Sequence, residues 1–133
     1  MDDLARQKYL TIAVRVIGLV LVFGIYPLTV LWPSGWSWHP GQSEYLHMII
    51  AIYVTLGVFL ILVSARPEKH LSLISFAIWS SIVHAAVMAV QAVVDTGHIG
   101  HLYGDVPALF VVAGVLGWLC PRALTLRFLT GAT

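Results

Sequence analysis

Long apolar runs separated by short polar segments dominate the pattern of the chain. They cover residues 10–32, 46–65, 71–94 and 101–120. A helix needs roughly 20 apolar residues to cross the roughly 30 Å hydrocarbon layer of a bilayer, and runs of these lengths meet that need. The pattern therefore predicts an all-α fold, a four-helix transmembrane bundle that forms one integral-membrane domain over residues 1–133.

The first and last runs are less regular than the middle two. The first contains Arg15 and Pro27, and we interpret it as a retained helix because it ends in Leu31-Trp32-Pro33 and not in a small-residue cleavage site. The clearly apolar part of the last run, residues 106–120, would be only about 22 Å long as a helix. Either residues 101–105 add a turn above a kink at Pro107, or the bilayer thins locally.

The cations lie on alternate connections, which predicts the orientation of the spans. They are Arg6, Lys8, Arg66, Lys69, Arg122 and Arg127, together with Arg15 inside the first run. The connections 33–45 and 95–105 contain no Lys or Arg. Short loops rich in Lys and Arg stay in the cytoplasm, so both termini are predicted to be cytoplasmic. The opposite side carries Trp36 and Trp38, whose segment we expect to lie on the membrane surface.

Composition narrows the class of protein further. Hydrophobic residues make up 59% of the chain and charged residues 10%, which is far from the balance of a soluble domain. The formal net charge of +1 comes from dispersed cations, so nucleic acid is not expected as a partner. Cys120 is the single cysteine, which excludes an internal disulfide and a four-thiolate iron–sulfur cluster within one chain. The partner that the composition implies is the lipid bilayer.

Small and polar residues share one face of the third run. Ala77, Ser81, His84, Met88, Gln91 and Asp95 follow one another at steps of four and three residues. This face either packs helix against helix, as small residues do in membranes, or presents His84 as a proton donor or acceptor oriented by Gln91 and Asp95. His84 and Gln91 are therefore the candidate catalytic residues. Structural partners expected for the His84 ring are Thr55, Ser80, Ser81 or water.

Histidines and acids gather at the predicted outer mouth of the bundle. The group consists of Glu44, His47, Asp95, His98, His101 and Asp105. His47, His101 and Asp105 are candidate ligands for zinc or copper, with Glu44 and Asp95 orienting the imidazoles. The alternative is a structural network in which Asp105 caps the fourth span and Glu44 caps the second. A haem held by His47 and His84 does not fit, because these histidines lie at different depths.

Two segments resemble a known type of membrane protein. The sequence SIVHAA at residues 81–86, continuing to Gln91, and HLYGDVP at residues 101–107 are similar to the third and fourth spans of small inner-membrane families of unknown function, which are DoxX-like in size and layout. The resemblance implies a compact four-helix bundle in a bacterial inner membrane. It also implies that His84, Gln91, His101 and Asp105 are the residues of functional interest.

These observations leave three functions open. The first is a non-enzymatic subunit or accessory protein of a larger membrane complex or of a homo-oligomer, for which Ala113 and Gly117 offer a small-residue face. The second is a membrane-embedded enzyme or carrier that acts on a lipid or a quinone through His84. The third is a metal-binding protein that uses the outer-face histidines. The sequence predicts the class of protein and does not choose among these functions.

Overall fold

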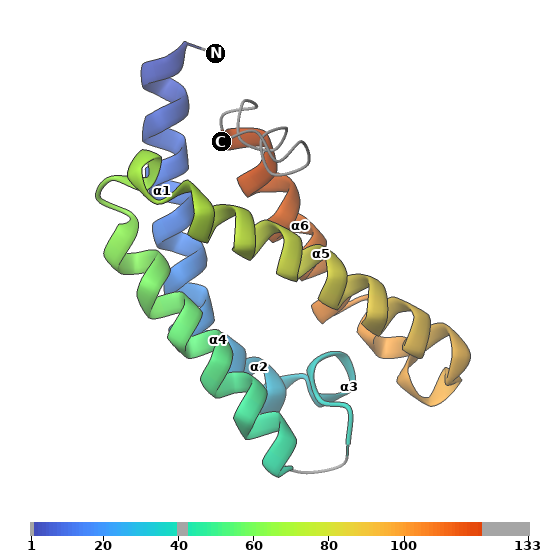
Figure 1. Ribbon diagram of the computed structural model, residues 1–133. Coiled ribbons are helices and arrows are strands. Elements are labelled where there is room, and N and C mark those ends of the chain that lie inside the picture. Colours follow the sequence, from blue (N-terminus) through green and yellow to red (C-terminus); the bar gives the residue numbers. More distant parts are fainter. Residues whose placement is uncertain (1, 40–42, 121–133) are drawn as a thin grey trace.

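The computed structural model describes residues 2–39 and 43–120, and these contain helices and no strands (Figure 1). The elements in chain order are α1 Asp3–Phe23, α2 Ile25–Leu31, α3 Pro33–Trp36, α4 Glu44–Val63, η1 Pro67–Lys69, α5 Leu71–Val94, η2 Thr96–Leu102 and α6 Asp105–Leu119, where η marks a 3₁₀ helix. The all-α prediction is confirmed. Arg122 and Arg127 lie outside the described residues.

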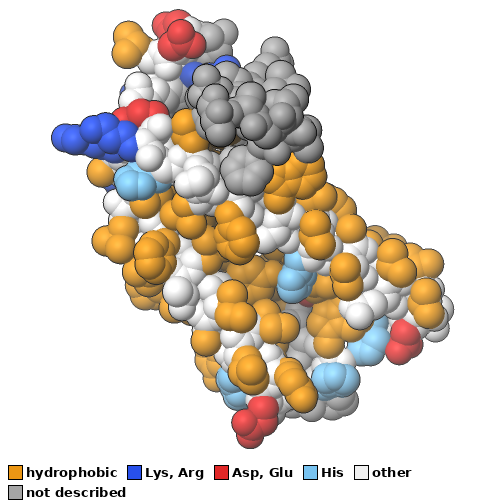
Figure 2. Space-filling view, viewed as in Figure 1, with side chains coloured by type: hydrophobic (Ala, Val, Ile, Leu, Met, Phe, Trp, Pro, Cys, Tyr) orange, Lys and Arg blue, Asp and Glu red, His pale blue; other side chains and the backbone are white. Residues whose placement is uncertain are grey.

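Three segments are long and apolar enough to cross a membrane. They are α4, α5 and the stretch Thr96–Leu119, which joins η2 to α6. The pair α1 and α2 makes a fourth if it counts as one bent span. Large hydrophobic side chains such as Ile52, Leu62 and Val93 point away from the rest of the chain, with 66–69% of their surface exposed. Figure 2 shows hydrophobic side chains over most of the visible face, as expected of a multi-pass membrane protein.

The first apolar run is not one continuous helix. α1 ends at Phe23, and α2 leaves it at an angle of 51°. Pro27 has no N–H to donate to the carbonyl of Phe23, and its ring would clash with that carbonyl in a straight helix. The break at Gly24 lies one turn before the proline for this reason. The helix predicted over residues 10–32 is therefore divided into two helices.

The fourth run gains its length from a second helical segment. η2 supplies a first stretch, and α6 begins at Asp105 with Pro107 in its first turn. The break between the two lies at Tyr103 and Gly104 and not at Pro107, where the first of the two alternatives placed a kink. A Cβ atom on Gly104 would collide with the backbone of Gly35, so this glycine permits η2 to pack directly on α3.

The helices form two arms that diverge (Figure 1). α1 packs along α4, and α5 packs along α6, while α1 also contacts α6 and so joins the arms. Gly18 and Gly57 let α1 and α4 approach closely, because a Cβ on Gly57 would lie 2.7 Å from the Gly18 carbonyl oxygen. α4 and α5 touch little and separate with distance from their connection, η1. The main core lies where the arms join and includes Val14, Leu60 and Leu116.

Hydrogen bonds across the chain gather the cationic segments at one end of the molecule. The Arg6 guanidinium donates to the carbonyl oxygens of Trp118, Leu119 and Cys120 over 2.9–3.1 Å, and Arg15 Nε donates to Ser64 Oγ over 3.1 Å. The start of α1, η1 and the end of α6 therefore lie together, and α3 and η2 lie at the opposite end (Figure 1). The predicted cytoplasmic location of the first end is a separate inference.

Candidate functional site

A cavity of about 650 Å³ lies between the two arms, and it is the candidate site. Its wall is mostly apolar and includes Ile50 of α4, Val87 of α5 and Leu109 of α6. The polar residues and aromatic residues with a polar atom that line it are Thr29, Trp36, Trp38, His39, Ser43, Tyr45, Tyr53, Ser80, His84, Gln91 and Asp105. An apolar chamber with a few polar groups is the usual form of a small-molecule site, and its volume is within the usual range of roughly 300–1,000 Å³.

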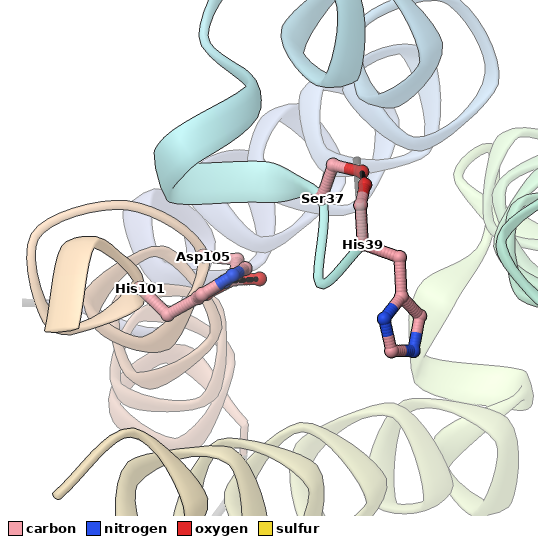
Figure 3. A network of polar contacts seen from close by, with 4 residues as sticks. All are labelled: Ser37, His39, His101 and Asp105. Atoms are coloured by element: carbon pink, nitrogen blue, oxygen red, sulfur yellow. Dashed lines mark hydrogen bonds and ion pairs between the residues drawn. The ribbon is translucent and has the colours of Figure 1, made fainter. Parts of the chain in front are cut away.

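A buried histidine and a buried acid form the polar centre of the site. His101 Nδ1 lies 2.8 Å from Asp105 Oδ2, and the two residues are only 1% and 7% exposed (Figure 3). His101 comes from η2 and Asp105 from the first turn of α6. The turn between these elements places the two side chains against each other. A carboxyl buried this deeply needs such a partner, because an isolated charge in the interior costs several kcal/mol.

Trp38 covers this pair from the side of α3. Its ring stacks on the His101 ring with centroids 4.1 Å apart and on the His98 ring with centroids 4.8 Å apart. The segment that carries it is held by Ser37, whose Oγ donates to the carbonyl oxygen of His39 over 2.9 Å (Figure 3). Trp38 also lines the cavity and is thus part of the site, whereas the location of its segment at the membrane surface stays a prediction.

Three buried side-chain atoms have no hydrogen-bond partner among the described residues. They are Trp36 Nε1, His101 Nε2 and Asp105 Oδ1. Trp36 and Asp105 both line the cavity. A buried polar atom without a partner costs about 1–3 kcal/mol, so native structures satisfy nearly all of them with protein, water or ligand. Two residues of the cavity wall therefore each contain a buried polar atom without a partner among the described residues.

His84 and Gln91, the candidate catalytic residues, both line the cavity. The His84 ring meets the Tyr53 ring edge-on across the two arms, with centroids 5.8 Å apart. Among the described side chains, Thr55, Ser80 and Ser81 make no hydrogen bond to His84: Thr55 Oγ1 donates to the carbonyl of Ala51, and Ser80 Oγ donates to that of Ala77. Both hydroxyls therefore donate hydrogen bonds within their own helices. His84 is left facing the cavity.

The remaining small residues of that helix face behave as packing residues. Ala77, Ser81 and Met88 are buried, with 1–7% of their surface exposed. The face of α5 therefore serves both predicted purposes. Ala77 and Ser81 pack within the protein, and His84, Met88 and Gln91 line the cavity.

The predicted metal ligands do not come together as one group. Among residues 2–39 and 43–120, no three His, Cys, Asp or Glu side chains are placed to hold one metal ion. His101 and Asp105 meet, whereas His47 lies exposed at the start of α4. Asp95 was predicted to orient an imidazole. Its Oδ1 accepts a hydrogen bond from the Gly97 N–H, and its Oδ2 lies 3.6 Å from His98 Nε2. The zinc or copper site is thus not assembled in this part of the chain.

The alternative prediction of two acidic helix caps is also corrected. Ser43 caps α4, because its Oγ accepts a hydrogen bond from the Leu46 N–H over 3.1 Å, and Glu44 is the first helical residue. Gly104 occupies the cap position of α6 without a side-chain bond. Asp105 instead turns one oxygen to His101 and buries the other.

A comparison with known protein families identifies the family of this chain. The pattern of a family of unknown function, DUF6632, matches residues 5–131. The chain belongs to the DUF6632 family. No curated protein and no solved structure matches it. The DUF6632 match includes every cavity residue, since all of them lie between positions 20 and 112. The resemblance to DoxX-like proteins stays a prediction.

Three cavity-lining residues of this DUF6632 protein were not identified as site residues from the sequence. Trp36, Trp38 and Tyr53 were assigned to the interface or to no role, because tryptophan near a span end is typical of a membrane anchor. A signal was nevertheless present. Gly35 beside Trp36, and Gly100 and Gly104 in the facing connection, are the small residues that such close packing requires.

Proposed function

We propose that this protein binds a lipid-soluble, amphipathic molecule, such as a lipid or a quinone, in the cavity between α4 and α5, as a carrier or binding protein. The observation that supports this most is the location of a mostly apolar chamber between two helices suited to cross a membrane. α4 and α5 diverge and touch little (Figure 1), so we expect the cavity between them to open towards the hydrocarbon layer. An apolar molecule enters such a gap without leaving the bilayer.

The polar groups are distributed to suit an amphipathic occupant. Asp105 and Trp36 lie near α3 and η2, at one end of the molecule, and apolar residues such as Leu21 and Val83 form the rest of the wall. A head group is therefore expected at the Asp105 end, with its tail along the apolar wall towards the junction of the arms. In this arrangement, burial stabilises the apolar tail, and hydrogen bonds stabilise the head group.

His84 gives the site a group that is able to exchange a proton. It faces Tyr53, and Asp105 lines the same cavity, so a second ionisable group accompanies the imidazole. Imidazole is the most common side chain in general acid–base catalysis. Binding is the function that the geometry supports, and a proton-transfer reaction on the bound molecule is an extension of it.

Blocking the cavity tests this function. Ala108 lines the cavity, whereas Val111, one turn further along α6, is 62% exposed. Ala108→Trp should therefore exclude the occupant, and Val111→Trp is the matched control. We expect protein isolated from native membranes into nanodiscs to release a stoichiometric lipid-soluble molecule, detected by mass spectrometry. The molecule should be absent from Ala108→Trp only. Its absence from the wild-type protein, or its presence in both variants, would overturn the proposal.

We also propose a bacterial inner membrane as the location, with both termini in the cytoplasm. The gathering of Arg6, Arg66 and Lys69 at one end of the molecule supports this, because cytoplasmic loops are enriched in such residues. Labelling of single cysteines by a membrane-impermeant maleimide tests it. Gly97→Cys should react in intact cells and Asp2→Cys only after lysis, and the reverse pattern would contradict the orientation.

A second function, that of a non-enzymatic subunit, is favoured by a separate groove between α1 and α6. It measures about 600 Å³ and is lined by Tyr9, Val16, Gly114 and Trp118, among others. A Cβ on Gly114 would meet nothing within 4 Å, so another helix has room to approach. We propose a second copy of this chain as its occupant.

Disulfide trapping tests this second function. In a Cys120→Ser background, Gly114→Cys should cross-link into a dimer in native membranes. Phe76→Cys, on the exposed face of α5, should not cross-link. Equal yields at both positions would show random collision and exclude a specific dimer.

A further inference from the structure

We infer that the head group of the bound molecule is an uncharged hydroxyl that donates a hydrogen bond to Asp105 Oδ1 and accepts one from Trp36 Nε1. The inference rests on the proposed binding function and specifies the chemical class of the ligand. It comes from the two buried atoms in the cavity wall whose hydrogen-bonding capacity the described residues leave unused.

The hydrogen-bonding roles of these two atoms are fixed by their surroundings. Trp36 Nε1 carries a proton and is only a donor. Asp105 Oδ2 is engaged by His101 Nδ1 at 2.8 Å, and one proton lies between these two atoms whichever of them holds it. We assign no second proton to this carboxyl, so Asp105 Oδ1 is an acceptor. The occupant must donate to one atom and accept from the other. A hydroxyl does both with a single oxygen.

Charged head groups do not match this wall. Its described residues include His39 and His84 but no Lys or Arg, so a phosphate or carboxylate head would lack a permanent cation and would face Asp105. A quaternary ammonium head has no acceptor for the Trp36 N–H.

The same reasoning separates the two oxidation states of a quinone. A quinone carbonyl accepts from Trp36 but has no proton for Asp105, whereas a hydroquinone hydroxyl satisfies both atoms. Hydroquinones and aliphatic alcohols such as isoprenoid or fatty alcohols share this hydroxyl chemistry. The two sources differ in the part next to the oxygen, which is a flat ring in one and a flexible chain in the other.

Matched pairs of probes test the inference on the full-length protein in phosphatidylcholine nanodiscs. One pair is hexadecanol and its methyl ether, and the other is a decyl-substituted hydroquinone and the corresponding quinone under reducing and oxidising conditions. Hexadecyl phosphate and hexadecyltrimethylammonium provide the charged heads. The readout is the indole N–H signal of Trp36 in protein labelled with ¹⁵N-tryptophan, assigned with Trp36→Phe.

We expect each hydroxyl compound to bind about tenfold or more tightly than its partner without a hydroxyl, because the partner leaves Asp105 Oδ1 unsatisfied. The Trp36 indole signal should shift on binding. The pair that gives the higher affinity identifies the source as aromatic or aliphatic. Trp36→Phe should lower the affinity for the alcohol several-fold. Trp118→Phe, on the far side of α6, should leave it unchanged.

Each other outcome has a defined meaning. Equal affinities for alcohol and ether, or tighter binding of a charged head, would overturn the hydroxyl assignment while the binding function stands. If none of the probes binds saturably and no molecule co-purifies with the protein, both the hydroxyl assignment and the binding function are overturned. Asp105→Val should abolish the preference for the alcohol. Slow reaction of the buried Cys120 thiol with a maleimide shows that this variant folds. If the variant does not fold, the affinities of the wild-type protein for the alcohol and the ether decide whether the hydroxyl assignment is correct.

Discussion

Replacing Gly57 by alanine should weaken the contact between α1 and α4 that holds one arm together. A Cβ at this position would lie 2.7 Å from the Gly18 carbonyl oxygen, 2.9 Å from Leu21 Cβ and 2.9 Å from Val22 Cγ2. The first two atoms belong to the backbone or are attached to it directly. They cannot rotate away as the end of a flexible side chain does, so the two helices must separate.

The size of the effect follows from this separation. Ordinary contact begins at 3.4 Å, so the backbone contact is too short by about 0.7 Å. Overpacking of a close interface typically costs about 1–3 kcal/mol. Alanine also favours a helix over glycine by up to about 1 kcal/mol, which partly offsets this cost. Gly114→Ala shares that gain and meets nothing within 4 Å, so it is the matched control.

The unfolding equilibrium in mixed micelles of dodecylmaltoside and SDS measures the difference. Cys120 is the only cysteine of the chain and is 1% exposed in the core that includes Val14 and Leu60. Its reaction with a maleimide therefore reports the opening of the folded state. We expect Gly57→Ala to be less stable than Gly114→Ala by about 1–3 kcal/mol. Identical unfolding midpoints for the two variants would refute the close approach of α1 and α4.

Three further variants test other contacts. Arg6→Met should lower the free energy of unfolding by about 1–2 kcal/mol and speed the maleimide reaction of Cys120, because three carbonyls at the end of α6 lose their donor; the same change in Lys8→Met would contradict this. Ser43→Ala should cost about 1 kcal/mol and accelerate hydrogen exchange at the Leu46 amide, with Thr55→Ala as control; an unchanged exchange rate would exclude the cap. Gly104→Ala should force η2 away from α3 at a cost of about 2 kcal/mol and shift the indole signals of Trp36 and Trp38, whereas Gly117→Ala should not; unmoved signals would show that the two segments are not in contact.

The candidate site was only partly predictable, as two groups of residues show. His84 and Gln91 were identified because ionisable and amide groups are costly in a membrane helix, and both line the cavity. The pairing of His101 with Asp105 lay within the predicted outer cluster. Trp36, Trp38 and Tyr53 were not recognised, since aromatic residues near span ends have a common alternative role and only the folded chain shows which surface they cover.

The sequence by itself determined the helices and their suitability for a membrane. α5 spans residues 71–94 as predicted, because the charges before it and Asp95 after it need water, and this preference depends on each segment alone. The bend at Gly24 likewise has a local cause in Pro27, although its size was not predictable. Only the tertiary structure decided that His47 lies apart from His101, and that a cavity opens between α4 and α5. Those outcomes depend on which helices approach closely, and that is set by non-local fits such as Gly18 against Gly57.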